Sequence, residues 1–206
     1  GPGTELRELL LMKRSEGVRI NIIYDAFGSW TTPAQYFETL RAAGVQLLEF
    51  SPINPLRHPI RWSVHLRDHR KLLVVDGRVA FIGGVNISSV YSRPPASGDR
   101  QMPWRDTHLR IEGPVVGDLQ RLYIEHWRSR ADAPPQPAQY FPRLEVVGHQ
   151  AVAVAACTAG RRRNPLYRAL LGAIRAAQNH VYITSAYFVP TRRLVRALID
   201  AARRGV

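Results

Sequence analysis

The stretch HRKLLVVDGRVAFIGGVN, residues 69 to 86, decides the fold that the sequence predicts. A basic start leads into four aliphatic residues, and a second short apolar run follows an Asp-Gly pair. Two runs rich in Val, Ile and Leu on either side of Asp-Gly are typical of two strands joined by a tight turn. We therefore predict a β-hairpin with its turn at Asp76 and Gly77.

His69 and Lys71 stand two positions apart at the start of this hairpin. Because successive side chains of a strand point to opposite faces, both are expected on the same face. An imidazole beside a fixed positive charge is suited to chemistry on an anionic substrate such as a phosphate ester. Gly83 and Gly84 carry no side chains, so a substrate has room to approach the backbone there.

The complete string resembles the HKD motif of the phospholipase D superfamily. It contains His-x-Lys, four residues, Asp, six residues, and then Gly-Gly-x-Asn. A surface hairpin with a basic start would explain the two strands but not this combination. The resemblance implies catalytic residues His69, Lys71 and Asp76, and substrate-binding residues Asn86, Gly83 and Gly84.

In enzymes of this superfamily, two HKD motifs face each other and build one site. The resemblance implies that one histidine attacks phosphorus to form a phosphohistidine, while the other protonates the leaving alkoxide and then activates the incoming alcohol or water. Lys71 would bind the non-bridging oxygens, and Asn86 would add a neutral donor. His69 is favoured as the nucleophile over an acid or base, and Asp76 is expected to orient an imidazole or to end the strand.

A second resemblance narrows the family. The segment WRDTHLRIEGPVV, residues 104 to 116, resembles the part of bacterial cardiolipin synthases that follows their first HKD motif, and residues 186 to 206 resemble the start of their second half. This implies a phosphatidyltransferase that moves a phosphatidyl group between lipid alcohols through a phosphohistidine. A phospholipase D hydrolase and a nuclease of the same superfamily are the alternatives.

Composition limits the partners. The 206 residues include 29 basic and 16 acidic side chains, a net charge of +13, which favours phospholipid head groups, a membrane surface or nucleic acid. The sequence has no interleaved aromatic and basic residues of the kind that form a platform for single-stranded nucleic acid. We therefore expect no specific nucleic-acid partner. We expect an anionic phospholipid substrate and a peripheral position on the cytosolic side of the bacterial cytoplasmic membrane. Cys157 is the single cysteine, which excludes an intrachain disulfide.

The order of elements predicts an α/β fold. Residues 4–16 have helical spacing, 18–24 read as a strand, a second helix starts at Thr32-Pro33, and 45–50 read as a second strand. Alternating helices and strands favour a parallel sheet. The resemblance adds a phospholipase D-like α/β/α sandwich with a mostly parallel mixed central sheet. Asp25 and Ser29 follow the first strand and are either near the site or turn-capping residues.

Three regions are expected along the chain. They are a first phospholipase D-like domain over residues 1–130, a proline-rich linker over 131–145, and an incomplete second domain over 146–206, with strands at 146–155 and 181–184. The last helix repeats the first at an offset of 188 residues, because Gly205-Val206 matches Gly17-Val18. A second HKD motif would then fall beyond Val206, so the site needs a missing second half or a homodimer partner.

Three other features have competing interpretations. His58 and His65 lie in a long loop before the motif, and we interpret each as a solvated histidine or as part of a head-group pocket. They have no acid or cysteine at metal-ligand spacing, so we predict no metal and no organic cofactor. Asp106 is either a partner for a site histidine or lysine, or an ion pair with Arg105. The run Arg161 to Arg163 is interpreted as a solvated loop.

Overall fold

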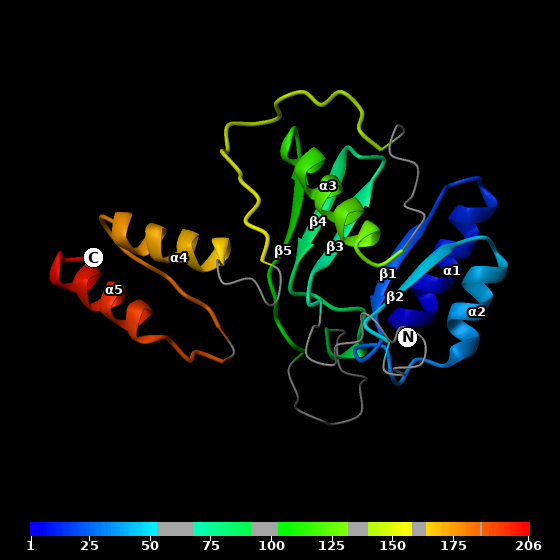
Figure 1. The fold of residues 1–206 in the computed structure, drawn as a ribbon, viewed down its shortest axis with the longest axis horizontal. Helices are drawn as coiled ribbons and strands as arrows, with labels where there is room; N and C mark the ends of the chain where they lie inside the picture. Colours follow the sequence, from blue (N-terminus) through cyan, green and yellow to red (C-terminus); the bar gives the residue numbers. More distant parts are fainter. Residues whose placement is uncertain (53–67, 92–102, 132–139, 158–163, 186) are drawn as a thin grey trace. The chain divides into compact units, whose positions relative to one another are not determined.

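The computed structural model describes residues 1–52, 68–91, 103–131, 140–157, 164–185 and 187–206 (Figure 1). They form two compact units, Gly1–Val152 and Ala153–Val206. Five α-helices and five strands occur in these residues, so the predicted α/β class is confirmed. The assignment of residues 1–130, 131–145 and 146–206 to a domain, a linker and a second domain stays a prediction.

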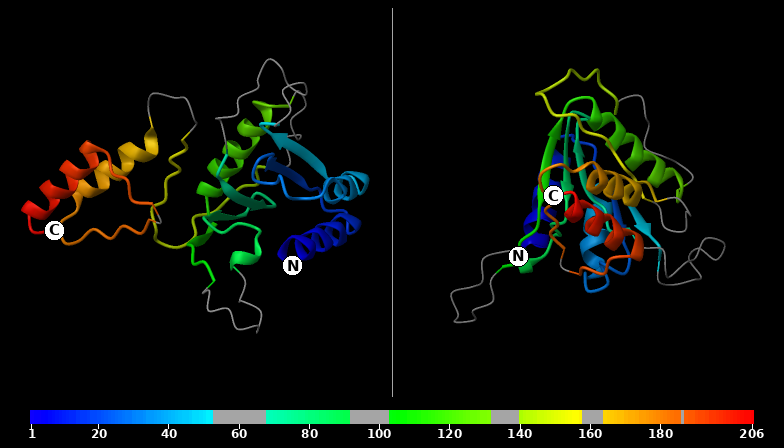
Figure 2. Two further views of the ribbon diagram at one scale, coloured as in Figure 1. Left: turned by 90° about the horizontal axis from the view of Figure 1, so that it is seen from below. Right: turned by 90° about the vertical axis from the view of Figure 1, so that its left-hand side faces the viewer.

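The first unit begins with the predicted alternation of helices and strands. In chain order these elements are α1 (Pro2–Ser15), β1 (Asn21–Asp25), α2 (Ala34–Ala42) and β2 (Gln46–Phe50). β1 and β2 are parallel, with Asn21 opposite Gln46 and Asp25 opposite Phe50. Figure 2 shows α1 and α2 beside this pair. The carboxyl end of β1 therefore places Asp25 at the edge where both strands finish.

The predicted hairpin is confirmed. β3 (Lys71–Val75) and β4 (Val79–Gly83) pair antiparallel, and β5 (His108–Glu112) pairs antiparallel with β4. The backbone N–H of Arg78 donates to the carbonyl of Val75 at 3.0 Å. Asp76 and Gly77 have φ of 53° and 64°, a left-handed conformation that Asp-Gly adopts at little cost in such turns.

The described strands form two small sheets, one a parallel pair and the other an antiparallel triplet. The parallel order inferred from the first two strands does not extend to β3, β4 and β5. The reason is local, since strands joined by a tight turn can only run antiparallel, whereas parallel strands need a long crossover.

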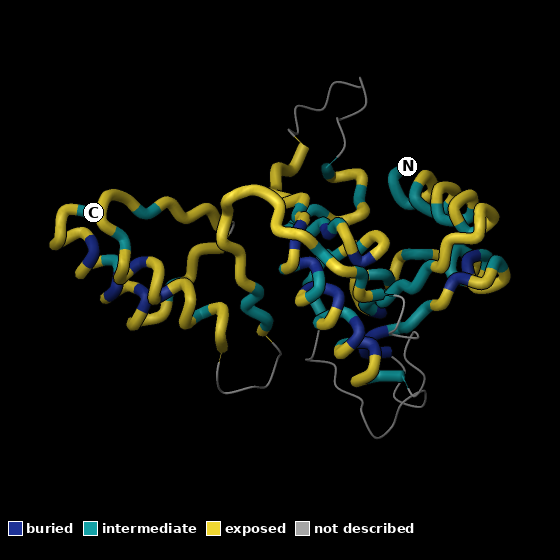
Figure 3. Tube along the Cα trace, turned by 90° about the horizontal axis from the view of Figure 1, so that it is seen from above, coloured by how far each residue is buried: buried dark blue, intermediate teal, exposed yellow. Residues whose placement is uncertain are grey.

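The helix α3 (Val115–Arg128) buries one face against the β3–β4–β5 sheet. Its buried apolar residues are Val116, Leu119, Ile124 and Trp127. They recur at intervals of three to five residues, as expected for an amphipathic helix. Figure 3 shows this inner stripe of buried positions. Ala80 of β4 is fully buried beneath this layer.

The second unit consists of two packed helices. They are α4 (Pro165–Ala176) and α5 (Arg192–Arg203), capped by the side chains of Asn164 and Thr191. Their shared core consists of Leu171, Ile174, Leu194, Ala197 and Ala201. The strands expected at 146–155 and 181–184 are not formed in the described residues. A strand needs a neighbour to satisfy its backbone groups, and the described part of these segments pairs with none.

No helix in the described part of the chain combines the length and the apolar character needed to cross a bilayer.

Candidate active site

The strand register gathers most of the HKD motif at one end of the antiparallel sheet. Lys71 at the start of β3 lies opposite Gly83 at the end of β4, and Gly83 lies opposite His108 at the start of β5. His69 precedes β3 by two residues. The tertiary structure therefore brings together the predicted histidine, lysine and glycines, and adds the beginning of β5.

The lysine is held next to the histidine's own peptide. The ammonium of Lys71 donates a hydrogen bond to the carbonyl oxygen of His69 at 2.7 Å. The His69 side chain is exposed, so its ring is accessible to a substrate. A cation and an accessible imidazole thus leave the same turn of the backbone, and their catalytic roles stay a prediction.

Because Gly83 and Gly84 have no side chains, other parts of the protein pack closely against their backbone. The backbone N–H of Gly84 donates to the carbonyl of Thr107 at 3.0 Å. A Cβ on Gly83 would lie 2.6 Å from the Cα of His108, and one on Gly84 would collide with the carboxylate of Asp106. The space expected for a substrate at these glycines is therefore taken by β5 and by Asp106. Substrate binding at Gly83 and Gly84 stays a prediction.

Asn86 lies just beyond β4 and is exposed. Its side-chain amide donates to the hydroxyl of Tyr91 at 3.4 Å, and that hydroxyl donates to the carbonyl of Gly84 at 3.4 Å. Both distances are long for such bonds, so the amide is loosely tethered at the motif end of the sheet. Its role as a donor to a substrate stays a prediction.

Asp76 is separated from the rest of the motif. It follows Val75 at the far end of β3, five residues from Lys71. At about 3.3 Å per residue this is roughly 16 Å. The catalytic role that the resemblance implies for Asp76 stays a prediction. Its positive φ favours the alternative role, in which it ends the strand and forms the turn.

Asp25, another acidic candidate, contacts the residue that precedes His69. Asp25 accepts the backbone N–H groups of Phe27 and Gly28 at 2.9 and 3.0 Å, which is the turn-capping role. Its other oxygen accepts the N–H of Asp68 at 3.4 Å, which also ties it to the segment before His69. Ser29 belongs to the same turn through its backbone N–H, which donates to the carbonyl of Asp25.

Asp106 lies against the Cα of Gly84. One of its oxygens accepts the N–H of Thr107 at 2.9 Å. An ion pair with Arg105 is not found among the described residues, so the position beside the motif is the better supported of its two interpretations. His58, His65 and Arg161 to Arg163 lie outside the described residues.

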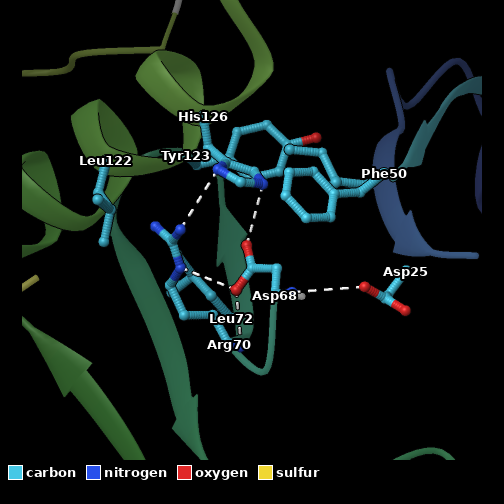
Figure 4. A pocket seen from close by; sticks show the side chains of 9 residues that line it. Asp25, Phe50, Asp68, Arg70, Leu72, Leu122, Tyr123 and His126 are labelled. Atoms are coloured by element: carbon cyan, nitrogen blue, oxygen red, sulfur yellow. Dashed lines mark hydrogen bonds and ion pairs between the residues drawn. The ribbon is translucent and has the colours of Figure 1, made fainter. Parts of the chain in front are cut away.

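A network of three charged or titratable side chains lies on the other face of the same segment (Figure 4). Oδ1 of Asp68 accepts both the backbone N–H and the Nε–H of Arg70 at 2.9 Å. Oδ2 of Asp68 lies 3.0 Å from Nε2 of His126 on α3. The Nη2 of Arg70 lies 3.3 Å from Nδ1 of the same histidine. A guanidinium only donates hydrogen bonds, so Nδ1 accepts and Nε2, which lies 3.0 Å from Asp68, carries the ring proton.

The network lines a cavity of about 90 Å³. Its walls are formed by Ile23, Asp25, Phe50, Asp68, Arg70, Leu72, Leu122, Tyr123 and His126. Burial alone would raise the pKa of Asp68, but hydrogen bonds from His126 and from the backbone of Arg70, with the charge of Arg70, hold this pKa well below its ordinary value. Burial raises the pKa of Tyr123 far above its ordinary value, so the phenol stays neutral.

The sequence analysis missed this network. It gave Asp68, Arg70 and His126 no role. A signal was present, because residues 68 and 70 alternate with 69 and 71 and must face the helix that the strand packs against. A histidine on the inner face of that helix is one of the partners that the sequence offers for a buried carboxylate, beside Arg70.

Among the described residues, no three His, Cys, Asp or Glu side chains are grouped closely enough to hold a metal ion. The expectation that the chemistry needs no metal and no cofactor stays a prediction.

Comparison with known proteins identifies the relatives of this chain. No family model matches it. It is 38% identical over 207 residues to cardiolipin synthase A of Pseudomonas fluorescens and 33% identical over 211 residues to cardiolipin synthase of Halalkalibacterium halodurans. Each alignment covers 99% of the chain. The chain is similar to bacterial cardiolipin synthases. The resemblance to them stated from residues 104 to 116 and 186 to 206 is thereby confirmed.

The cardiolipin synthase-like chain spans 40 to 41% of the length of the relatives it matches. Cardiolipin synthase A of Pseudomonas aeruginosa, 37% identical over 207 residues, shows the same proportion.

Proposed function

We propose that this chain supplies one half of a phosphatidyltransferase site of the cardiolipin synthase type. The observation that carries the proposal is the HKD string, which occurs in a chain 33 to 38% identical to cardiolipin synthases over 99% of its length. The whole site would contain a second HKD motif, from another segment or from a second copy of this chain. The finer architecture that we propose is the α/β/α sandwich of the phospholipase D superfamily.

The proposed reaction has two displacements. The imidazole of His69 attacks the phosphorus of phosphatidylglycerol or a related lipid, a P–N bond forms, and the P–O bond to the leaving alcohol breaks. The leaving oxygen takes a proton from the second histidine. The acceptor alcohol then loses its proton to that histidine and attacks phosphorus, and the P–N bond breaks.

Lys71 would stabilise the charge that develops on the non-bridging oxygens. The bond of its ammonium to the carbonyl oxygen of His69 supports a role for this cation close to residue 69. Stabilisation of this kind is worth about 10²- to 10³-fold in rate for a single donor. Asn86 adds a neutral donor at the same end of the sheet.

The proposed substrate is an anionic phospholipid at the surface of the cytoplasmic membrane, and the net charge of +13 supports electrostatic attraction to that surface. Hydrolysis by water follows the same first step, so a phospholipase D activity is the alternative. A nuclease activity is less favoured, because the relatives are named for a lipid product.

The test uses vesicles that contain phosphatidylglycerol, with products separated by thin-layer chromatography. We expect little turnover from the chain at low concentration and more where homodimers form. Lys71→Ala should lower the rate by about 10²- to 10³-fold. Arg78→Ala is the matched control, because it removes an exposed cation from the far end of the same hairpin. Full activity from a strict monomer would refute the half-site proposal.

A labelled oligonucleotide assayed in parallel distinguishes the alternatives. Cleavage of the oligonucleotide without any lipid product would replace the lipid assignment with the nuclease. Phosphatidic acid without cardiolipin would identify the hydrolase.

A further inference from the structure

His69 is the central residue of an Asx-turn. The carboxylate oxygen Oδ1 of Asp68 accepts the backbone N–H of Arg70 at 2.9 Å, and this bond closes a ring around the peptide units of residue 69. The same oxygen accepts Nε of Arg70 at 2.9 Å. The conformation of the backbone that presents the His69 imidazole is therefore fixed by the side chain that precedes it.

The turn is held from helix α3. Oδ2 of Asp68, the oxygen that does not close the turn, lies 3.0 Å from Nε2 of His126. The ring of His126 packs on Phe50 of β2, with centroids 4.7 Å apart. Both the Asp68 and the His126 side chains are largely buried, with exposed fractions of 15% and 13%. Burial strengthens a hydrogen bond of this kind and fixes the orientation of the carboxylate.

A further contact holds the opposite side of the turn. Lys71 donates to the carbonyl oxygen of His69 at 2.7 Å. The backbone N–H of Asp68 donates to Asp25 at 3.4 Å, and the carbonyl of His69 accepts from Lys71. The ring that Asp68 closes lies between these two contacts. Side chains 68 and 70 reach toward α3, while the histidine ring remains exposed.

We propose that Asp68 and His126 are positioning residues for His69, and that His126 acts through the contact of its protonated Nε2 with the carboxylate that closes the turn. The proposal rests on the proposed function, since it assigns His69 as the reacting residue. A salt bridge that only joined α3 to the sheet would serve equally well anywhere along β3. Here the carboxylate belongs to the residue before His69 and bonds to the residue after it.

The first test compares two variants of Asp68 in the full chain. Asp68→Asn keeps an oxygen that can close the Asx-turn, whereas Asp68→Ala removes it. Hydrogen exchange of the Arg70 amide, followed by NMR, reads the turn directly. We expect the exchange rate to rise about tenfold in Asp68→Ala and to change less than about threefold in Asp68→Asn. Asp118→Asn is the control, because it alters an exposed ion pair on α3.

The second test separates donation from packing at His126. His126→Gln keeps a donor but loses the ring, while His126→Phe keeps a ring against Phe50 and loses the donor. We expect Gln to preserve the slow exchange of the Arg70 amide and Phe to accelerate it about three- to tenfold. A role in packing alone predicts the reverse order. This pair also decides the matter if Asp68→Ala does not fold.

The third readout is at the reacting group. Inorganic phosphate is titrated against each variant, and the ring signals of His69 report its binding. We expect phosphate affinity to follow the order of the exchange rates and to fall about tenfold or more in His126→Phe, since a small misplacement of a reacting group has effects of this size. The positioning role is overturned if the Arg70 amide exchanges equally fast in His126→Phe and in wild type. It is also overturned if phosphate affinity is equal in proteins whose Arg70 exchange rates differ. If the Arg70 amide of the wild type exchanges slowly but its His69 ring signals do not change when phosphate is added, the proposed function is refuted instead.

Discussion

The substitution Gly83→Ala tests the packing of the site end of the sheet. Gly83 is the last residue of β4 and lies opposite Lys71 on one side and His108 on the other. A Cβ at this position would lie 2.6 Å from Cα and 2.8 Å from Nδ1 of His108, and would also collide with the carbonyl oxygen of Thr107. Two of these three atoms belong to the backbone of β5 or the residue before it, so rotation of a side chain cannot relieve the contact.

The cost follows from this geometry. Overpacking in a well-filled site costs about 1–3 kcal/mol, and the upper half of that range applies because β5 must shift against its pairing with β4. For a unit of about 150 residues, 1 kcal/mol corresponds to roughly 2–4 °C in Tm. We therefore expect Gly83→Ala to lower the free energy of unfolding by about 2–3 kcal/mol and Tm by about 4–12 °C.

The assay is thermal unfolding of the full chain followed by circular dichroism, with urea unfolding as a second measure. Gly117→Ala is the matched control, because Gly117 lies within α3 of the same unit and its Cβ would meet nothing within 4 Å. Replacing a helical glycine with alanine stabilises by up to about 1 kcal/mol, so the control should move Tm upward. If the Tm of Gly83→Ala lay within about 1 °C of the wild-type Tm, the close approach of β5 to Gly83 would be refuted.

Three further predictions concern single residues. Asp76→Asn should leave Tm and phosphodiester turnover within about twofold of wild type, because asparagine also tolerates the positive φ of this turn; a large loss of turnover at unchanged Tm would restore a catalytic role. The pKa of Asp68 is lowered in the folded chain, so its contribution to stability is present above about pH 4 and is lost as the pH falls below that value. The free energy of unfolding of Asp68→Asn, measured in urea, should therefore depend less on pH below about 4 than that of wild type. An unchanged dependence would contradict the lowered pKa of Asp68. Asn164→Ala should destabilise the second unit by about 1 kcal/mol, because the Asn164 side chain accepts the N–H of Tyr167 at 2.9 Å at the start of α4; an unchanged unfolding midpoint of that unit would exclude the cap.

The sequence determined the local elements of this protein. The Asp-Gly turn and the alternation of helices with strands depend on residues close together in the chain. The HKD spacing likewise placed His69 and Lys71 together, since residues two apart on an extended chain share a face. Each of these features was predicted because its physical cause lies within a few residues.

Only the tertiary structure decided how these elements meet. It placed β5 and Asp106 against the two glycines, and in the described part of the chain it left the first two strands in a sheet of their own. It also brought His126, 58 residues along the chain from Asp68, onto the carboxylate that closes the turn at His69. Contacts of this kind depend on strand register and on which helix face is buried, and both are settled by packing across the whole unit.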